Sequence, residues 1–217
     1  SKNIFDDLSI RTPDINLNAP SESESNQFQY IVKELQKIFK NCEINKVGVF
    51  GDVTSTLAAS IAAKQSEIFL FHVESGLRSN NLSMPEERNR IMVDAISDLL
   101  LIPSEDAREN LLKERVSSDK IHNVGNIMID TLFKNKSKII HKSENIKDTL
   151  NINKPYFVIT LHRPSNLNDD TLKDIFEAIS NFTKDYQIIL PAHPRLKYYI
   201  GDNNIELTNI ILIDPLS

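Results

Sequence analysis

The chain has 217 residues, of which 40% are apolar and 25% charged, so it can form the core of one large domain or two small ones. Its net charge of −5 and the lack of a basic cluster exclude non-specific nucleic-acid binding, which requires neutralisation of phosphates. A single cysteine, Cys42, excludes an internal disulfide and a cysteine zinc site. No signal peptide and no apolar run of roughly 20 residues is present, so we expect a cytoplasmic protein without a membrane partner.

The first part of the chain predicts alternating helices and strands after a loop, 11–27, that is rich in Pro, Asn and Ser. Short apolar runs predict strands at 46–50, 67–73 and 120–124. We expect helices at 28–42, 54–64 and 104–114 and from 125 onward, with Thr54 and Ser104 as the N-caps of the second and third. A further helix is expected along the stripe of Ile91, Ala95 and Leu99, and it runs into the apolar residues that follow.

A polar and charged segment, 141–155, predicts a linker, after which the alternation restarts. The second part predicts strands at 156–162, 187–193 and 209–215, with a helix at 169–183. Strands that alternate with helices of this length indicate parallel sheets covered on both faces. We therefore predict an α/β fold with two domains, residues 1–150 and 151–217.

Both ends of the chain lack an element that a doubly wound domain usually has. The chain opens on a loop and a helix instead of a central strand, and it closes on an apolar strand without a covering helix. Exposed apolar faces and edges are disfavoured in complete domains. We therefore expect a fragment in which both domains are incomplete and which is itself weakly active or inactive.

Four polar side chains follow predicted strands: Asp52, Glu74, His162 and His193. Ligands of open parallel sheets bind at the carboxyl ends of the strands, and a cleft between the two domains could gather all four side chains. Structural roles remain open for the two carboxylates. Asp52 could form a turn or cap the next helix, and Glu74 could pair with Arg78.

Glu86 has a structural explanation of its own, because Ser83 and Glu86 match a capping box and Glu86 is spaced for an i,i+4 pair with Arg90. His162 and His193 could be core histidines, but each lies near an arginine, which favours anion binding. No metal-ligand spacing, dinucleotide-binding or P-loop glycine pattern, or G-x-S-x-G motif is present. We therefore expect no metal and no cofactor.

Six blocks in chain order, "GDVTSTLAASIAA", "HVESGLRS", "MPEERNR", "VGN", "TLHRPSN" and "PAHPR", resemble the UDP-N-acetylglucosamine 2-epimerase family, in its non-hydrolysing bacterial type. The resemblance implies two Rossmann-like domains of the glycosyltransferase-B type with a UDP-sugar in the cleft between them. It also implies the interconversion of UDP-N-acetylglucosamine and UDP-N-acetylmannosamine for surface polysaccharides, and a homodimer formed through the N-terminal domain.

The family pattern assigns roles by motif position. The residues that match its catalytic groups are Asp52, Glu74, Glu86 and His162, and the expected substrate contacts are Arg90, Arg163 and His193. We expect Arg90 mainly to position Glu86. The family's first strand, its "GTRPE"-type loop and its "SGG" stretch are absent, and "HVESG" replaces the usual "HVEAG". A hydrolysing epimerase, a glycosyltransferase of the same fold and a non-catalytic binding fragment remain alternatives.

Overall fold

The computed structural model describes residues 5, 8, 10–20, 23–161, 169–182, 185–192, 194–202, 207 and 210–214. The chain divides into two compact units. The N-terminal unit comprises Pro13–Phe133, and the C-terminal unit comprises Lys134–Ser217 with Ser1–Thr12. The predicted division after residue 150 lies C-terminal to this boundary.

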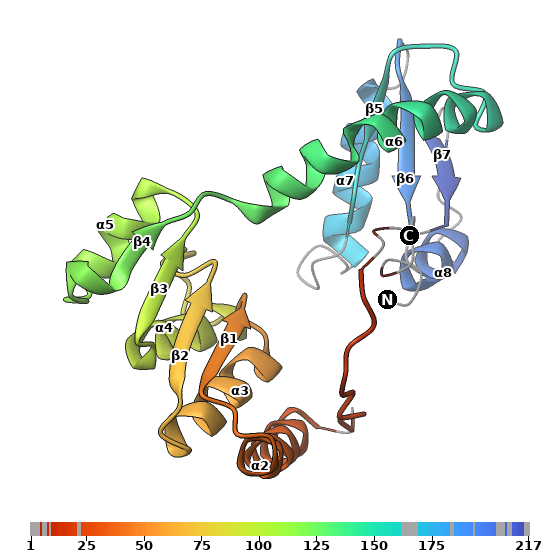
Figure 1. The fold of residues 1–217 in the computed structure, drawn as a ribbon. Coiled ribbons are helices and arrows are strands. Elements are labelled where there is room, and N and C mark those ends of the chain that lie inside the picture. The colour runs from red at the N-terminus through yellow and green to blue at the C-terminus, as the bar shows by residue number, and fades with distance from the viewer. Residues whose placement is uncertain are drawn as a thin grey trace. The chain divides into compact units, whose positions relative to one another are not determined.

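A four-stranded parallel sheet forms the centre of the N-terminal unit, with its strands side by side in chain order (Figure 1). The strands are β1 (Lys46–Phe50), β2 (Phe69–Val73), β3 (Leu99–Ile102) and β4 (Ile121–Asn123). The helices are α2 (Glu24–Asn41), α3 (Thr54–Gln65), α4 (Pro85–Ile96) and α5 (Glu105–Lys113), and a short 3-10 helix spans Ser118–Lys120. Because the strands are parallel, all of their carboxyl ends lie at one edge, where ligands of such sheets bind.

The core of this unit consists of apolar side chains from alternate strand positions and from the helices packed on them. Leu70 and Leu100 are fully buried in neighbouring strands, and Val93 of α4 is fully buried as well. Burial of one such side chain contributes about 1.5–3 kcal/mol relative to exposure. The small residues Ala62 and Ala63 are also fully buried. They lie on α3, which contacts β1, β2, α2 and α4.

The predicted helical stripe of Ile91, Ala95 and Leu99 is wrong. Helix α4 ends at Ile96, and the apolar run that follows it forms β3. Ala95 is exposed, whereas Val93 and Asp94 are buried. A short, continuously apolar strand has no alternation, so its sequence cannot be distinguished from that of a buried helix by periodicity.

The two predicted N-caps differ in outcome. Thr54 is the first residue of α3, and the N-cap is Val53. The Thr54 hydroxyl donates to Glu24 Oε1 over 2.7 Å. Ser104 is the N-cap residue of α5, as predicted, but its hydroxyl makes no capping hydrogen bond.

The C-terminal unit contains a three-stranded parallel sheet in the order β5-β6-β7. The strands are β5 (Tyr156–Val158), β6 (Gln187–Pro191) and β7 (Ile210–Ile213), and the helices are α6 (Ile127–Thr149), α7 (Asp169–Phe182) and α8 (Pro194–Asp202). The core of this sheet includes Leu172, Leu190 and Leu196, each 1% exposed. Parallel sheets in both units confirm the predicted α/β class.

Two helices of this unit differ from the sequence-based expectation. Helix α6 begins within the N-terminal unit and continues to Thr149, so most of the predicted linker 141–155 is helical. No Gly or Pro interrupts residues 127–149, which explains why the helix persists despite its polar composition. Helix α8 is not predicted from the sequence. None of the helices in the described ranges is long and apolar enough to span a membrane.

Candidate functional site

The predicted carboxylates Asp52 and Glu74 follow two neighbouring strands. Phe50, the last residue of β1, pairs in register with Val73, the last residue of β2. The N–H of Gly51 donates to the carbonyl of Val73 over 3.3 Å, which joins the two loops at their start. A Cβ atom added to Gly51 would lie 3.8 Å from Glu74 Oε2, so the Glu74 carboxylate lies beside the Asp52 loop.

Glu74 has a left-handed backbone conformation, with φ of 72°. This conformation costs a residue other than glycine of the order of 1–2 kcal/mol. It is maintained by two bonds to the carbonyl of Leu101, from the N–H groups of Glu74 (3.1 Å) and Ser75 (3.3 Å). The carboxylate makes no hydrogen bond or ion pair with the described residues, and Arg78 pairs elsewhere. The structural alternative for Glu74, an ion pair with Arg78, is therefore wrong.

Asp52 is held by two side chains of α4. Its Oδ2 lies 2.9 Å from Arg90 Nη1, and both side chains are mostly buried, with exposed fractions of 21% and 13%. Asn89 Nδ2 donates to the main-chain carbonyl of Asp52 over 2.9 Å. Asp52 precedes the cap of α3 by one residue and makes no capping bond. Its position is therefore set by α4, a helix that lies 33 or more residues further along the chain.

The predicted structural role of Glu86 is not observed. The N-cap of α4 is Met84, and the Ser83 hydroxyl donates to Asn81 Oδ1 over 2.7 Å, so no capping box forms. Glu86 is exposed in the first turn of α4, where negative charge is favoured by the helix dipole. Because Arg90 pairs with Asp52, it does not position Glu86 as we expected.

Three predicted site residues, His162, Arg163 and His193, lie outside the described residues. The structure therefore brings together Asp52, Glu74 and Arg90 at one sheet edge. It places Glu86 at the start of the helix that carries Arg90. Among the described residues, no group of His, Cys, Asp and Glu could hold a metal ion.

A buried polar pair, His72 and Asp94, underlies this edge and was missed from the sequence. Both side chains are completely buried, and His72 Nδ1 lies 2.7 Å from Asp94 Oδ1. His72 Nε2 lies 2.8 Å from the carbonyl oxygen of Gly51. Asp94 Oδ2 accepts from the N–H of Gly76 over 3.1 Å and lies 2.8 Å from Arg78 Nη1. The pair therefore contacts both loops that carry predicted catalytic carboxylates.

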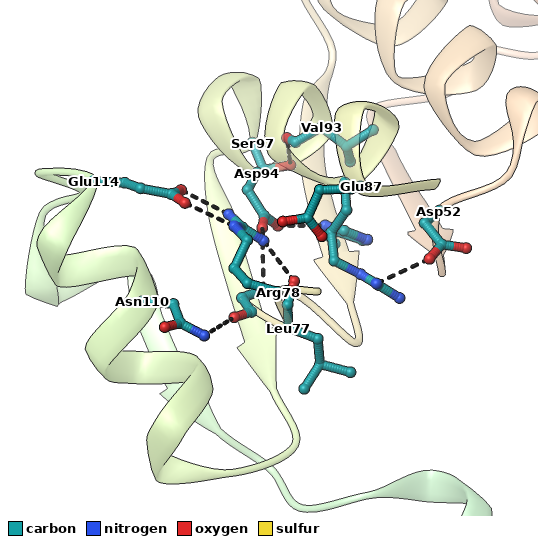
Figure 2. Close-up of polar contacts among 12 residues, drawn as sticks. Asp52, Leu77, Arg78, Glu87, Val93, Asp94, Ser97, Asn110 and Glu114 are labelled. Carbon is teal, nitrogen blue, oxygen red and sulfur yellow. Dashed lines mark hydrogen bonds and ion pairs between the residues drawn. The ribbon is translucent and has the colours of Figure 1, made fainter. Parts of the chain in front are cut away.

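Arg78 extends the network to Glu114, the residue that follows the last residue of α5, as Figure 2 shows. Its Nε and Nη2 donate to the two carboxylate oxygens of Glu114 over 2.7 and 2.6 Å. Burial alone would lower the pKa of Arg78, but its hydrogen bonds and its attraction to Glu114 and Asp94 raise the pKa above its ordinary value. Arg78 thus stays cationic and connects α4 to α5. Asn110 of α5 adds a bond to the carbonyl of Gly76 over 3.0 Å.

Glu87 fixes the next part of the loop. Its buried carboxylate accepts from the N–H and hydroxyl of Ser79 over 2.8 and 3.0 Å, and from the N–H of Asn80 over 3.0 Å. Burial opposes ionisation, but these hydrogen bonds and the charge of Arg78 hold the pKa of Glu87 below its usual value. Glu86 and Glu87 are adjacent in sequence, yet the Glu87 carboxylate is buried against the loop whereas Glu86 is exposed at the start of α4.

Comparison with known proteins identifies the family. The model of the family described as UDP-N-acetylglucosamine 2-epimerase matches residues 1–217. The chain belongs to this family. A relative named UDP-N-acetylglucosamine 2-epimerase from Methanococcus maripaludis is 36% identical, over 99% of this chain and 62% of its own length. The chain thus spans about three fifths of the relatives that it matches.

Solved structures of family members show the same fold. The UDP-GlcNAc 2-epimerase from Methanocaldococcus jannaschii, in complex with UDP-GlcNAc and UDP, matches with a TM-score of 0.85 and 35% identity, over 100% of this chain and 62% of the other. The enzyme from Neisseria meningitidis, bound to UDP-GlcNAc, matches with a TM-score of 0.88 and 30% identity, over 99% and 62%. These matches confirm the predicted glycosyltransferase-B type fold, part of which the chain contains.

Proposed function

We propose that the natural protein interconverts UDP-N-acetylglucosamine and UDP-N-acetylmannosamine. The observation that carries this proposal is the pair of neighbouring strand-end carboxylates, Asp52 held by Arg90 and Glu74 without a partner in the described part of the chain. Membership of the family supports the substrate class, since two related structures hold UDP-GlcNAc.

The proposed reaction requires more than one acid or base. The C2–H of a 2-acetamido sugar is not adjacent to a carbonyl carbon, so a carboxylate cannot remove it directly. Cleavage of the C1–O bond, with its electron pair leaving on UDP, develops positive charge at C1 and makes C2–H acidic. A carboxylate then takes the C2 proton, and a glycal with a C1–C2 double bond remains.

The second half of the reaction reverses these steps on the other face of the sugar. An acid group delivers a proton to C2 from the opposite side, and the UDP oxygen adds back to C1. We assign these proton transfers to Asp52, Glu74 and Glu86, together with His162. A carboxylate beside C1 would also stabilise the cationic character that develops there. We assign binding of the diphosphate and the sugar to Arg90, Arg163 and His193.

The decisive experiment follows C2 of the sugar by NMR in deuterated water. The natural full-length protein is incubated with UDP-N-acetylglucosamine, and we expect deuterium at C2 together with UDP-N-acetylmannosamine. Release of UDP and free N-acetylmannosamine would indicate a hydrolysing epimerase instead. Absence of both C2 labelling and epimerised product would contradict the proposal and favour a glycosyltransferase or a binding protein.

Two further assignments accompany this function. We place the activity in the cytoplasm. We also propose a homodimer through the N-terminal unit. Apolar side chains at the start of α6, among them Leu132 and Phe133, are exposed and offer a surface of this unit on which a second subunit could pack. Light scattering on the full-length protein tests the dimer, and a monomeric mass at micromolar concentration would contradict it.

A further inference from the structure

The Asp94 carboxylate holds parts of two different loops. Its Oδ2 binds Gly76 and Arg78, which belong to the same loop as Glu74. Its Oδ1 binds His72, which in turn binds the carbonyl of Gly51, the residue before Asp52. The fully buried Asp94 carboxylate is therefore connected by hydrogen bonds to both the loop that carries Asp52 and the loop that carries Glu74.

The main chain of the loop after β1 is held at three consecutive carbonyl groups. Thr56 Oγ1 donates to the carbonyl of Phe50 over 2.7 Å, and Asn89 Nδ2 donates to that of Asp52 over 2.9 Å. Between them, His72 Nε2 lies 2.8 Å from the carbonyl of Gly51. The donors come from α3, α4 and β2, so each fixes the loop to a different element.

Both ring nitrogens of His72 have a hydrogen-bond partner. The carbonyl oxygen of Gly51 can only accept, so Nε2 must carry a proton. The other ring nitrogen, Nδ1, lies 2.7 Å from Asp94 Oδ1, so the ring is held at both ends. The ring cannot rotate without losing both bonds, and at complete burial no water can replace them.

We propose that the Asp94–His72 pair is a positioning device for the epimerisation, which holds Asp52 and Glu74 at one fixed separation through the main chain of their loops. This inference rests on the proposed function. Both side chains are completely buried beneath the loops, so they act through the main chain and do not contact substrate. Displacement of a catalytic group by about 1 Å can reduce a rate about 100-fold, so loss of the pair has a measurable cost.

Asp94→Asn is the direct test. The carboxylate accepts from a ring N–H, a backbone N–H and a guanidinium, whereas an amide offers one oxygen and turns its NH2 group toward one of these donors. We expect a folded full-length variant in which kcat falls about 10- to 100-fold and KM changes less than about twofold. A folded variant with wild-type kcat would overturn the positioning role.

Asp98→Asn is the matched control. Asp98 also binds a backbone N–H, that of Leu70 over 2.8 Å, and a cation, Lys64 over 2.9 Å. It lies before β3, and the Leu70 that it contacts is near the amino end of β2, away from the candidate site. The same chemical change there should lower stability and leave kcat unchanged. Equal losses of kcat in the two variants would show that the effect of Asp94→Asn is general destabilisation.

If Asp94→Asn does not fold, a measurement on the unaltered protein tests the hydrogen bond to Gly51 on which the proposal depends. Two-dimensional ¹⁵N NMR of the histidine rings should show a protonated Nε2 for His72 and slow exchange of this proton with water. An unprotonated Nε2 would overturn the proposal, because it cannot donate to Gly51. An unaltered protein without epimerase activity would contradict the proposed function instead, so the two failures are distinguishable.

Discussion

Arg90 on α4 forms an ion pair with Asp52 at the end of β1, with Nη1 and Oδ2 2.9 Å apart. The pair joins a helix to a loop that precedes it by more than thirty residues in the chain. Since Asn89 binds the main chain of Asp52, two consecutive residues of α4 fix both the backbone and the carboxylate of one candidate catalytic residue. The helix therefore determines where Asp52 points.

Replacement of Arg90 by Gln should impair catalysis and also lower stability. The pair is mostly buried, so removal of the guanidinium leaves a carboxylate with little access to solvent and should lower the free energy of unfolding by about 1–3 kcal/mol. Loss of the guanidinium releases the carboxylate of Asp52, so we expect kcat to fall about 10- to 100-fold. Arg108→Gln is the control, because Arg108 pairs with Glu105 on α5 and contacts none of the candidate site residues that the structure describes. Loss of kcat in both variants would remove the special role of Arg90.

Glu74→Gly should stabilise the protein and abolish its activity. Glycine adopts φ of 72° without steric cost, so the free energy of unfolding should rise by about 0.5–1 kcal/mol. Glu67 provides the control, because its φ is 56° and it precedes the amino end of β2, whereas the candidate site lies at the carboxyl end. Glu67→Gly should stabilise by a similar amount with full activity. Glu74→Gln separates strain from chemistry: it should lose C2 exchange at unchanged stability, and a folded Gln variant that retains exchange would contradict the catalytic role.

Ser75→Ala should raise the free energy of unfolding by about 1 kcal/mol. The Ser75 hydroxyl is buried and has no hydrogen-bond partner among the described residues, and a buried unsatisfied polar group costs about 1–3 kcal/mol. Ser97→Ala is the control, because the buried Ser97 hydroxyl donates to the carbonyl of Val93 over 2.7 Å. That variant should lose stability. Urea unfolding of both variants gives the comparison, and destabilisation by Ser75→Ala would show that the hydroxyl has a partner.

Glu87→Gln should reduce stability in a pH-dependent manner. The pKa of Glu87 in the folded protein lies below its ordinary value of 4.5, so the carboxylate stabilises the folded state fully above pH 4.5. As the pH falls through the folded-state pKa, this contribution is lost. The difference in unfolding free energy between the unaltered protein and the variant should therefore be largest at neutral pH and shrink below pH 4.5. A constant difference from pH 7 to pH 3 would contradict this.

The sequence was sufficient to place Asp52 and Glu74 at one edge of a sheet. That prediction needs only the ends of two strands and the rule that parallel strands end at the same edge. It did not reveal the partner of Arg90, since i,i+4 spacing favours Glu86 whereas the folded chain offers Asp52. Local spacing describes one helix, but an ion pair between elements depends on how the helix packs.

The His72–Asp94 pair could not be predicted for a related reason. Its recognition requires knowing which face of α4 lies against β2, and the apolar residues Ile91 and Ala95 indicated a different face. The structure buries Asp94 and exposes Ala95. Polar residues that satisfy one another can thus occupy a core position, and hydrophobic periodicity alone does not detect them.

The three donors that fix the loop after β1 all bind main-chain oxygens, those of Phe50, Gly51 and Asp52. A clamp on the main chain does not depend on which side chains the loop carries. The side chain at position 52 can therefore be altered by substitution while the path of the loop is preserved, whereas a change in His72 or Asn89 alters the path and moves an unaltered carboxylate. The side chain at position 52 and the path of its loop are therefore determined by different residues, so mutagenesis can vary one without the other.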